Sequence, residues 1–537
     1  MASVAGLFEA YLSGGAHAFY AGNVSMRDDR TRAVERAKRP LSPRVLSRLR
    51  AQNQRFGTSA ARNAQLSALE RGACAVVTGQ QVGLFLGPLF TLYKAATAIA
   101  LARQLEAETG RAAVPVFWLQ TEDHDLPEIA RCVLPRVEEG AQPCVLAPEI
   151  ARNNRVSIAH LQLPAAVSSW LSQLREELGA EPHAAEHLAR LARHYRPQQT
   201  WSSAFAGVLA ELFEPEGLLL LDPRDPELAA ETAPLMAQAL ERSAELGSAL
   251  CAHGEALAQA GFAQTVHVRP DSPLCFYHPQ GATGPRTRLV ARGAGWLEPD
   301  SERVHSTAEL LASLAREPLS FSSSALLRPL LQDSLLPTAA YVGGPAEVAY
   351  YAQLPPLYRA LGFSPPFVAP RARVRLIEPR ARRLLDKLGL RAADATRSEA
   401  DLLSQLELRA PDALPSAEQL EQRLQHDFEA ALQAGLSPLP EALRDELERH
   451  VGKTRAKLRQ SARKLSLAYG KARLRRDALR VSQVQRLKQL LAPGDAPQER
   501  VYGLPYFGAR YGDRALTARV IEGVVPSAPA DILELLL

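Results

Sequence analysis

Two polar turns carry the residues of this sequence that are best suited to chemistry. The later turn, Thr121–Asp125, reads TEDHD and places three carboxylates around one imidazole. Adjacent like charges raise carboxylate pKa values, and a group that titrates near neutrality can act as a general acid or base. We therefore assign proton transfer or amine positioning to His124 with Asp123 or Asp125, and substrate binding to Glu122.

Two other interpretations of the Thr121–Asp125 turn stay open. Carboxylates at this spacing can hold a divalent metal, although we assign no metal ligand. The turn can also be a polar loop in which Asp125 caps the next helix.

The earlier turn, Thr78–Gly87, reads TGQQVGLFLG and favours an anion. Gly79 and Gly83 let backbone amides approach a ligand closely, and the positive end of the following helix points to the same place. The spacing matches neither the dinucleotide-binding fingerprint nor a P-loop, so a tight structural turn followed by a solvated Lys94 remains the alternative. We predict substrate or anion binding by Thr78, Gly79, Gln80, Gln81, Gly83 and Lys94.

The segments around these turns predict a βαβ unit. Cys74–Val77 and Val114–Leu119 are short apolar runs typical of buried strands, and apolar residues recur at helical spacing from Pro88 to Glu108. Two parallel strands joined by a helix belong to a sheet with right-handed crossovers. Ligands bind such sheets beyond the carboxyl ends of the strands, so we expect both turns to face one crevice.

A second strand, glycine turn and helix follow later in the chain. Thr338–Val342 is an apolar run stopped by Gly343-Gly344-Pro345, which again presents amides at a helix start. Glu347 in the first helical turn either stabilises the helix dipole or recognises an amine. A guanidinium after the next predicted strand can hold a carboxylate or phosphate. We predict binding by Arg328, Gly343, Gly344, Glu347 and Arg371.

These motifs resemble a known family. TGQQVGLFLGPLFTLYK and PVFWLQTEDHDLPE, with further blocks at Leu326–Leu354, Ala369–Arg371 and Gln498–Gly512, are similar to the bacillithiol biosynthesis cysteine-adding (BshC) proteins. The resemblance implies an α/β fold with a Rossmann-like parallel sheet similar to that of nucleotidylyltransferases. It also implies inserted connecting regions and an α-helical coiled-coil domain that dimerises.

The resemblance further implies a ligase that adds cysteine to the amine of glucosaminyl malate, an amino-sugar conjugate. Amide formation from a free carboxylate needs activation, for which we expect ATP, through either an acyl-adenylate or an acyl-phosphate. The chain departs from the family at Ser323-Ser324, at Ala346 and at Pro355-Pro356. These departures keep open a nucleotide-dependent ligase or transferase that acts on another small amine.

The composition is that of an ordinary globular protein. The chain has 537 residues, a hydrophobic fraction of 46%, a charged fraction of 23% and a net charge of +5, so two to three domains are expected. No export signal and no membrane-spanning run is evident, and five cysteines without CxxC spacing indicate reduced thiols. We therefore expect a cytoplasmic protein without a membrane partner.

The region after about Glu378 predicts an antiparallel coiled-coil hairpin broken near Leu436–Pro440. Its small and polar seam residues make the hairpin weak alone, so we expect a homodimer. Lys and Arg recur over Arg449–Arg476 without an acid; we interpret this stripe as a solvated face, with nucleic-acid or scaffold binding as the alternative. The predicted seam is Leu447, Val451, Thr454, Leu458, Ser461, Leu465, Ala468 and Ala472.

The predicted organisation places the Rossmann-like core in several pieces. An N-terminal helical segment (1–63) with an amphipathic basic helix precedes the first half of the core (64–135). Two inserted regions (136–200 and 261–317) alternate with the core continuation (201–260) and its second half (318–378). The coiled-coil domain (379–492) and a C-terminal segment that docks on the core (493–537) complete the chain.

Overall fold

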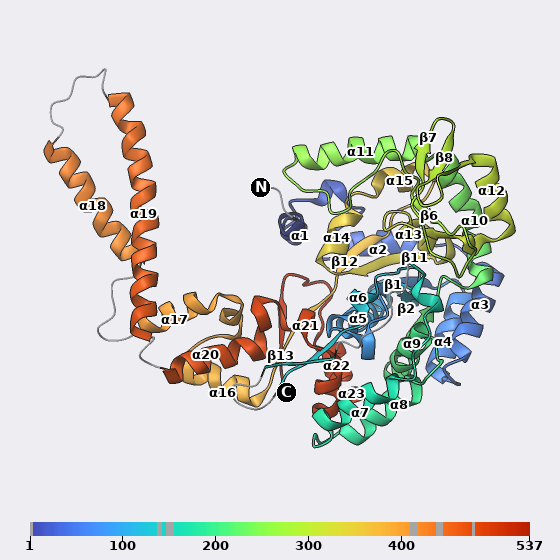
Figure 1. Cartoon of the computed structure of the whole chain (residues 1–537), viewed down its shortest axis with the longest axis horizontal. Helices are drawn as coiled ribbons and strands as arrows, with labels where there is room; N and C mark the ends of the chain where they lie inside the picture. The colour runs from blue at the N-terminus through green and yellow to red at the C-terminus, as the bar shows by residue number, and fades with distance from the viewer. Residues whose placement is uncertain (1–3, 137–141, 147–154, 409–416, 436–443, 475–477) are drawn as a thin grey trace. The chain divides into compact units, whose positions relative to one another are not determined.

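The computed structural model describes residues 4–136, 142–146, 155–408, 417–435, 444–474 and 478–537 (Figure 1). They form two compact units. The larger contains Met1–Leu134, Pro143–Arg375 and Tyr502–Leu535, and the smaller contains Pro135–Gln142, Leu376–Val501 and Leu536–Leu537. The predicted coiled-coil domain thus corresponds to most of the smaller unit, whereas the predicted C-terminal segment is divided between the two.

A five-stranded parallel sheet forms the centre of the larger unit. Its strand order is β12-β11-β1-β2-β5. The order runs outward from β1 in both directions, first through β2 to β5 and then through β11 to β12. The topological switch point, where ligands bind in doubly wound sheets, therefore lies between β1 and β11. The strands are β1 (Cys74–Gln80), β2 (Ala113–Leu119), β5 (Leu219–Leu221), β11 (Thr338–Gly343) and β12 (Phe367–Pro370).

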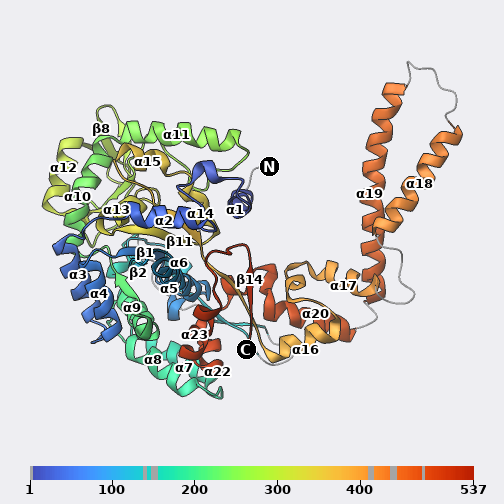
Figure 2. The ribbon, with the colours of Figure 1, turned by 180° about the vertical axis from the view of Figure 1, so that it is seen from behind.

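Alternating side chains bury both faces of the sheet. Ala75 and Val77 of β1 share a core cluster with α3 (Pro43–Gln54), α10 (Pro226–Glu241) and α13 (Arg328–Leu335), whereas Cys74 and Val76 share one with α2 (Arg27–Arg36) and α5 (Phe90–Thr109). Figures 1 and 2 show α9 (Trp201–Leu212) on one side of the sheet and α10 and α13 on the other. A sheet covered on both faces has near-continuous apolar strands, which is why the predicted strand runs lacked polar alternation.

The predicted βαβ unit is confirmed, with one difference in the helix start. Helix α5 (Phe90–Thr109) begins two residues after Pro88 and ends at Gly110, which has a φ of 69°. The delay arises because Leu84–Leu86 form a 3-10 turn in which Phe85 and Leu86 adopt positive φ angles.

The remaining elements of the larger unit surround this sheet. Those before β5 are α1 (Val4–Leu12), α2 (Arg27–Arg36), α3 (Pro43–Gln54), α4 (Ala60–Glu70), α6 (Leu126–Ile129), β3 (Cys132–Leu134), β4 (Cys144–Leu146), α7 (Val167–Leu178), α8 (Ala184–His194) and α9 (Trp201–Leu212). Those after β5 are α10 (Pro226–Glu241), α11 (Ser243–Gln259), β6 (Cys275–Tyr277), β7 (Val290–Arg292), β8 (Gly295–Glu298), β9 (Arg303–Ser306), α12 (Thr307–Arg316), β10 (Phe321–Ser323), α13 (Arg328–Leu335), α14 (Pro345–Tyr351), α15 (Pro355–Ala360), α22 (Leu504–Tyr511) and α23 (Asp513–Gly523). Strands β13 (Arg373–Ile377) and β14 (Ile532–Leu536) pair with each other.

The alternating pattern of the second inserted region predicts antiparallel strands at Thr265–Arg269, Leu274–His278 and Arg286–Ala291, and the structure differs from it in part. Only β6 and β7 fall on predicted strands, and β6 pairs with β10 rather than with β7. The run beginning at Thr265 is not a strand, because the backbone N–H groups of Thr265 and Val266 donate to the side-chain oxygen of Gln353 instead of a neighbouring strand.

The two chain ends of the larger unit pack on its core. Val45 and Leu49 of α3 are buried, and Arg48 pairs with Asp225 at 2.7 Å, as expected of an amphipathic helix with a basic face. At the other end, the buried Asp513 of α23 pairs with His187 and Arg190 of α8.

The smaller unit contains the predicted helical hairpin. Glu421 and Glu429 of α18 pair with Arg459 and Arg455 of α19, an order that makes the helices antiparallel and neutralises part of the basic stripe. The predicted break at Leu436–Pro440 falls within residues 436–443, which lie outside the described residues. The helices of this unit are α16 (Pro379–Leu388), α17 (Glu399–Leu408), α18 (Ala417–Gly435), α19 (Arg444–Leu474), α20 (Ala478–Leu491) and α21 (Gln498–Val501).

The predicted heptad seam is wrong in the second half of α19. Leu465 is 60% exposed, while Ala462 and Ser466 are buried. The buried face shifts because small residues let α17 approach: a Cβ on Gly470 would lie 3.1 Å from the Cα of Ser404.

None of the described helices has the length and apolar character needed to span a bilayer.

Candidate functional site

A buried ion pair occupies the switch point of the sheet. The Lys94 ammonium of α5 donates to the carbonyl oxygen of Gly79 at 2.7 Å and to Oε1 of Gln80 at 2.8 Å, and it pairs with Glu347 of α14. An ammonium has three donors, so these partners use all of them. Lys94 is thus neither solvated nor ready to bind an anion, which corrects both sequence-based interpretations of this residue.

Glu347 is held from three directions. Its carboxylate accepts hydrogen bonds from the Tyr341 hydroxyl at 2.6 Å and the Gly344 N–H at 2.8 Å, in addition to the Lys94 contact. Burial raises the pKa of Glu347, but Lys94 and these donors outweigh it and keep that pKa below its ordinary value. The amine that Glu347 binds in this structure is that of Lys94. Gly343 is required because a Cβ there would lie 2.9 Å from the Cβ of Glu347.

Two further cations flank this pair. Arg371 is buried, its guanidinium lies 5.4 Å from the centre of the Phe90 ring, and a Cβ added to Gly344 would lie 3.7 Å from its Nε. Arg328 is also buried and lies 5.1 Å from the centre of the Tyr341 ring. Burial lowers the pKa of Lys94, and both arginines act in the same direction against Glu347. Three cations against the carboxyl groups of Glu347 and Asp333 leave an excess of positive charge at the switch point, which suits a phosphate or carboxylate group.

The glycine turn itself is closed rather than open to a ligand. Tyr195 receives the N–H of Phe85 at 2.8 Å, and the indole of Trp201 donates to the carbonyl of Val82. The N–H of Gly83 is bonded to the Gln81 carbonyl, and a Cβ on Gly83 would lie 2.8 Å from the Cα of Gly87. Gly83 therefore serves a tight turn, and the prediction that it cradles an anion is not supported by this geometry.

The start of the same turn does lie at the sheet edge. Thr78 is fully buried and its hydroxyl donates to the Val342 carbonyl, so it links β1 to β11 instead of facing a crevice. Gln81 Nε2 donates to Oδ2 of Asp123 at 2.6 Å. This bond confirms that the ends of β1 and β2 present their polar turns to one place.

Asp123 is the most strongly bound carboxylate of the second turn. Its Oδ1 accepts from the His124 N–H at 2.7 Å and from Arg286 at 2.8 Å. Burial alone raises the pKa of Asp123, but His124, Arg286 and Gln81 together hold it well below its usual range. The expectation that neighbouring carboxylates raise this pKa is therefore wrong for Asp123, because donors and a cation face it more closely.

Arg286 is the site residue that sequence reasoning missed. It follows β6 in the second inserted region, and its Nε and Nη2 lie 3.0 and 2.6 Å from Nδ1 of His124. Its Nη1 donates to the Glu122 carbonyl at 3.2 Å, and its guanidinium lies 4.4 Å from the centre of the Phe276 ring. A guanidinium only donates, so its contact with Nδ1 of His124 favours the tautomer with the hydrogen on Nε2, whereas the 3.4 Å distance from Nδ1 to Oδ1 of Asp123 favours a hydrogen on Nδ1. His124 is about one third exposed and can reach a ligand.

The other two carboxylates of the turn have separate partners. Asp125 is exposed and accepts from the Glu128 N–H at 3.3 Å, so it caps α6 and is not part of a catalytic cluster. Glu122 points toward β10, where its Oε2 accepts hydrogen bonds from the hydroxyl and the N–H of Ser323. Ser324 accepts from the Leu327 N–H near the start of α13.

A buried histidine and two buried cysteines have surroundings that indicate structural roles. His278 is buried between the Gly284 carbonyl and the Ser322 hydroxyl, and burial lowers its pKa to about 4. Burial raises the thiol pKa of Cys74 to about 11 and that of Cys132 to about 12. No group of three or more His, Cys, Asp or Glu side chains in the described parts of the chain is arranged to hold a metal ion.

Comparison with known proteins places this geometry in a family. Residues 2–372 match the "Bacillithiol biosynthesis BshC, N-terminal Rossmann-like domain", and residues 374–522 match the "Bacillithiol biosynthesis BshC, C-terminal coiled-coil domain". Three relatives share the name "Putative cysteine ligase BshC". The Koribacter versatilis protein is 36% identical over 87% of this chain and 85% of its own length. The Salinibacter ruber protein is 32% identical over 93% and 90%, and the Geobacillus thermodenitrificans protein is 30% identical over 86% and 85%.

Replacement of Lys94 tests the buried pair. Lys94→Met leaves the Glu347 carboxylate buried without its cation and is expected to lower the free energy of unfolding of the larger unit by about 3–5 kcal/mol. Lys94→Met with Glu347→Gln should cost less than the sum of the single changes. Tryptophan fluorescence in urea measures this unit, because all four tryptophans lie in it.

The matched control is Lys38→Met. Lys38 pairs with Glu35 where both side chains are more than half exposed, so its loss should cost about 0–1 kcal/mol. Equal effects of the Lys94 and Lys38 substitutions would contradict the role assigned to the buried pair.

Replacement of Arg286 tests the electrostatics of the second turn. Arg286→Gln removes a cation from Asp123 and should raise the pKa of that carboxyl toward its ordinary value. In the unaltered protein the depressed pKa stabilises the fold above about pH 4, and this stabilisation is lost as the pH falls. Carboxyl-carbon NMR of labelled aspartate, assigned with Asp123→Asn, measures the shift.

Arg288→Gln is the control for Arg286, because Arg288 lies over the same Phe276 ring at 4.7 Å. Arg288→Gln should leave the pKa of Asp123 unchanged. An Asp123 titration that is the same in the Arg286→Gln protein and the unaltered protein would overturn the assignment.

Proposed function

Because this chain belongs to the BshC family of bacillithiol biosynthesis, we propose that it is a ligase that adds L-cysteine to the amine of glucosaminyl malate. The single observation that carries the proposal at the level of residues is the meeting of Gln81, Asp123, His124 and Arg286 at the ends of β1 and β2. This cluster lies beside an electropositive switch point, the arrangement that a carboxylate-activating enzyme needs.

ATP is the proposed co-substrate, and it supplies the activation of the cysteine carboxylate. Arg328 and Arg371 are two buried cations beside the Lys94–Glu347 pair, and their positive charge supports a phosphate-bearing molecule at the switch point. The two arginines hold charge beside the switch point, while Lys94 fixes the side chain of Gln80. Whether activation proceeds by adenylation or phosphorylation is left open.

The tautomer of His124 defines its proposed role. With Nδ1 bound by Arg286, the imidazole presents an N–H at Nε2 and is suited to donate a hydrogen bond rather than to accept a proton. We assign it to the acyl oxygen that gains negative charge as the amine attacks, in the manner of an oxyanion-hole donor. Asp123 keeps Arg286 and Gln81 in place and, as a carboxylate, attracts the positively charged amine.

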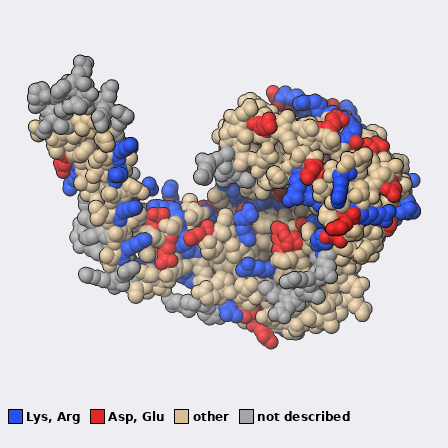
Figure 3. Space-filling view, turned by 45° about the horizontal axis from the view of Figure 1, so that its top comes forward, with Lys and Arg blue, Asp and Glu red and all other residues tan. Residues whose placement is uncertain are grey.

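Two other functions were open from the sequence. A different small amine as acceptor remains the second candidate, since Ser323 lies at the site and bonds to Glu122. Profiling of metabolites in a deletion strain separates the two, because an unchanged bacillithiol pool favours the second candidate. For nucleic-acid binding by the basic stripe of α19 there is less support, because Arg455 and Arg459 pair with Glu429 and Glu421 of α18. Over the face of the larger unit seen in Figure 3, Lys and Arg are also mixed with Asp and Glu.

The activity test uses purified protein with cysteine, glucosaminyl malate and ATP, and measures the ligated product by mass spectrometry. His124→Ala should lower kcat about 100- to 1,000-fold, as loss of an oxyanion donor does. His124→Gln should retain more activity, because its amide can donate near the position of Nε2.

The control is His267→Ala, which changes an exposed histidine of the second inserted region. It should keep full turnover. Failure of the folded, unaltered protein to form product would contradict the proposed reaction. Equal loss in the alanine and glutamine variants of His124 would instead show that the residue acts as a base and not as a donor.

A further inference from the structure

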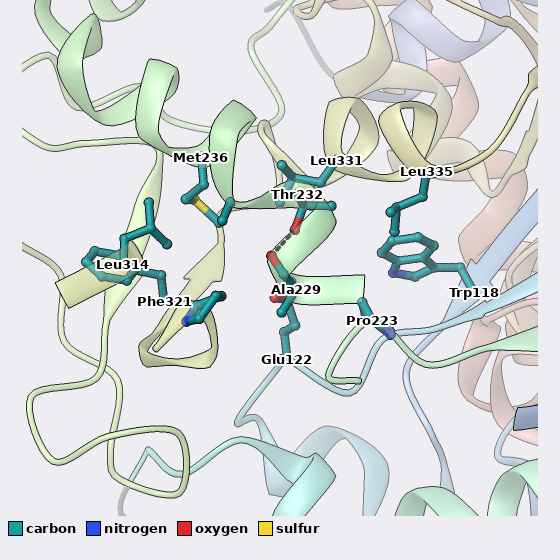
Figure 4. Close-up of a pocket in the computed structure, with 12 residues that line it drawn as sticks. Trp118, Glu122, Pro223, Ala229, Thr232, Met236, Leu314, Phe321, Leu331 and Leu335 are labelled. Atoms are coloured by element: carbon teal, nitrogen blue, oxygen red, sulfur yellow. Dashed lines mark hydrogen bonds between the residues drawn. The ribbon is translucent and has the colours of Figure 1, made fainter. Parts of the chain in front are cut away.

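A small pocket lies next to the candidate site, on the sheet face covered by α10 and α13. Figure 4 shows Glu122 between Trp118 and Leu335 on one side and Met236, Leu314 and Phe321 on the other. The accessible volume is about 20 Å³, which is room for one water-sized group. Ten of the twelve lining residues are apolar, whereas polar atoms supply a substantial share of the exposed wall, so the pocket suits a compact group of mixed polarity.

Glu122 is the one ionisable side chain among the residues that line this pocket. Ser323 holds Oε2 of its carboxylate, and no donor in the described residues is bonded to Oε1. The positive charges of Arg224 and Arg286 act on this carboxylate, but neither side chain donates to Oε1, and a buried anionic oxygen gains free energy from a direct donor. The arrangement therefore favours a ligand that joins an ammonium group to a small apolar end.

Thr232 adds a second polar feature. Its hydroxyl donates to the Ala229 carbonyl at 3.1 Å, as the dashed line in Figure 4 shows, so its oxygen keeps acceptor capacity toward the pocket. A thiol is a weak donor that loses little on leaving water, whereas a hydroxyl loses stronger hydrogen bonds. We therefore expect the pocket to favour a thiol over a hydroxyl of similar size.

We propose that this pocket is the side-chain subsite for cysteine, with the Glu122 carboxylate binding the ammonium group and the thiol entering between Met236 and Phe321. The inference rests on the proposed function and specifies which side of the crevice the amino acid occupies. Asp123 and His124 directly follow Glu122 in the chain, so the carboxyl group of the same molecule is presented to them. The acceptor amine then approaches from the solvent-exposed side of His124.

Calorimetric titration under reducing conditions, with and without a non-hydrolysable ATP analogue, tests the subsite. The full chain should bind L-cysteine more tightly than L-serine, and L-leucine more weakly than both. Glu122→Gln should weaken cysteine binding at least about tenfold, because a hydrogen bond to a charged group is lost. The matched control is Glu128→Gln, which removes the same charge from an exposed residue of α6.

Ala233→Val keeps the proposal testable if Glu122→Gln does not fold. Ala233 lines the pocket, so the added methyl groups should weaken cysteine binding about tenfold or more while glycine binding is kept. The subsite is overturned if cysteine binds both variants as tightly as it binds the unaltered protein. It is also overturned if cysteine does not bind the unaltered protein. If product forms equally well with Glu122→Gln, the subsite alone is rejected. If cysteine binding depends on Glu122 but no product forms, the proposed reaction alone is rejected.

Discussion

The contact between the Lys94 ammonium and the Glu347 carboxylate is the interaction on which the rest of the site depends. It joins α5, which follows β1, to α14, which follows β11, and so closes the two halves of the sheet at the point where their order reverses. Both charges are buried, and each is satisfied only by the other together with backbone and side-chain partners. Such a pair adds little net stability but penalises any arrangement that separates it. The position of Gln80, and with it the end of β1, follows from this constraint.

The second constraint comes from outside the sheet. The inserted region after α11 contributes Arg286, and β10 contributes Ser323, so the polar turn after β2 is completed by segments distant in sequence. Glu122, Asp123 and Asp125 have similar chemistry and nearly adjacent positions, yet one faces a pocket, one binds a guanidinium and one caps a helix. Their different partners, rather than their residue type, decide which of them can take part in a reaction.

Much of the fold was predictable because apolar periodicity reports burial directly. The buried strands, α5, and the second strand and glycine turn ending at Gly344 all follow from local pattern. The partner of Lys94 was not predictable, since its reach depends on which helix lies across the switch point. No local pattern indicated the role of Arg286, because its bond to His124 joins residues 162 positions apart and the sequence around it predicts only short strands. The closure of the Gly83 turn also depended on distant aromatic residues, Tyr195 and Trp201.

A crystal structure with cysteine, glucosaminyl malate and a non-hydrolysable ATP analogue bound is the most direct measurement of whether the two turns form one reaction site. The result expected here has the ligands beyond the carboxyl ends of β1 and β2, with the acyl oxygen of cysteine within hydrogen-bond distance of His124 Nε2 while Arg286 still holds Nδ1 and Lys94 still pairs with Glu347. Ligands bound at another edge of the sheet, or a His124 side chain that faces away from them, would contradict it.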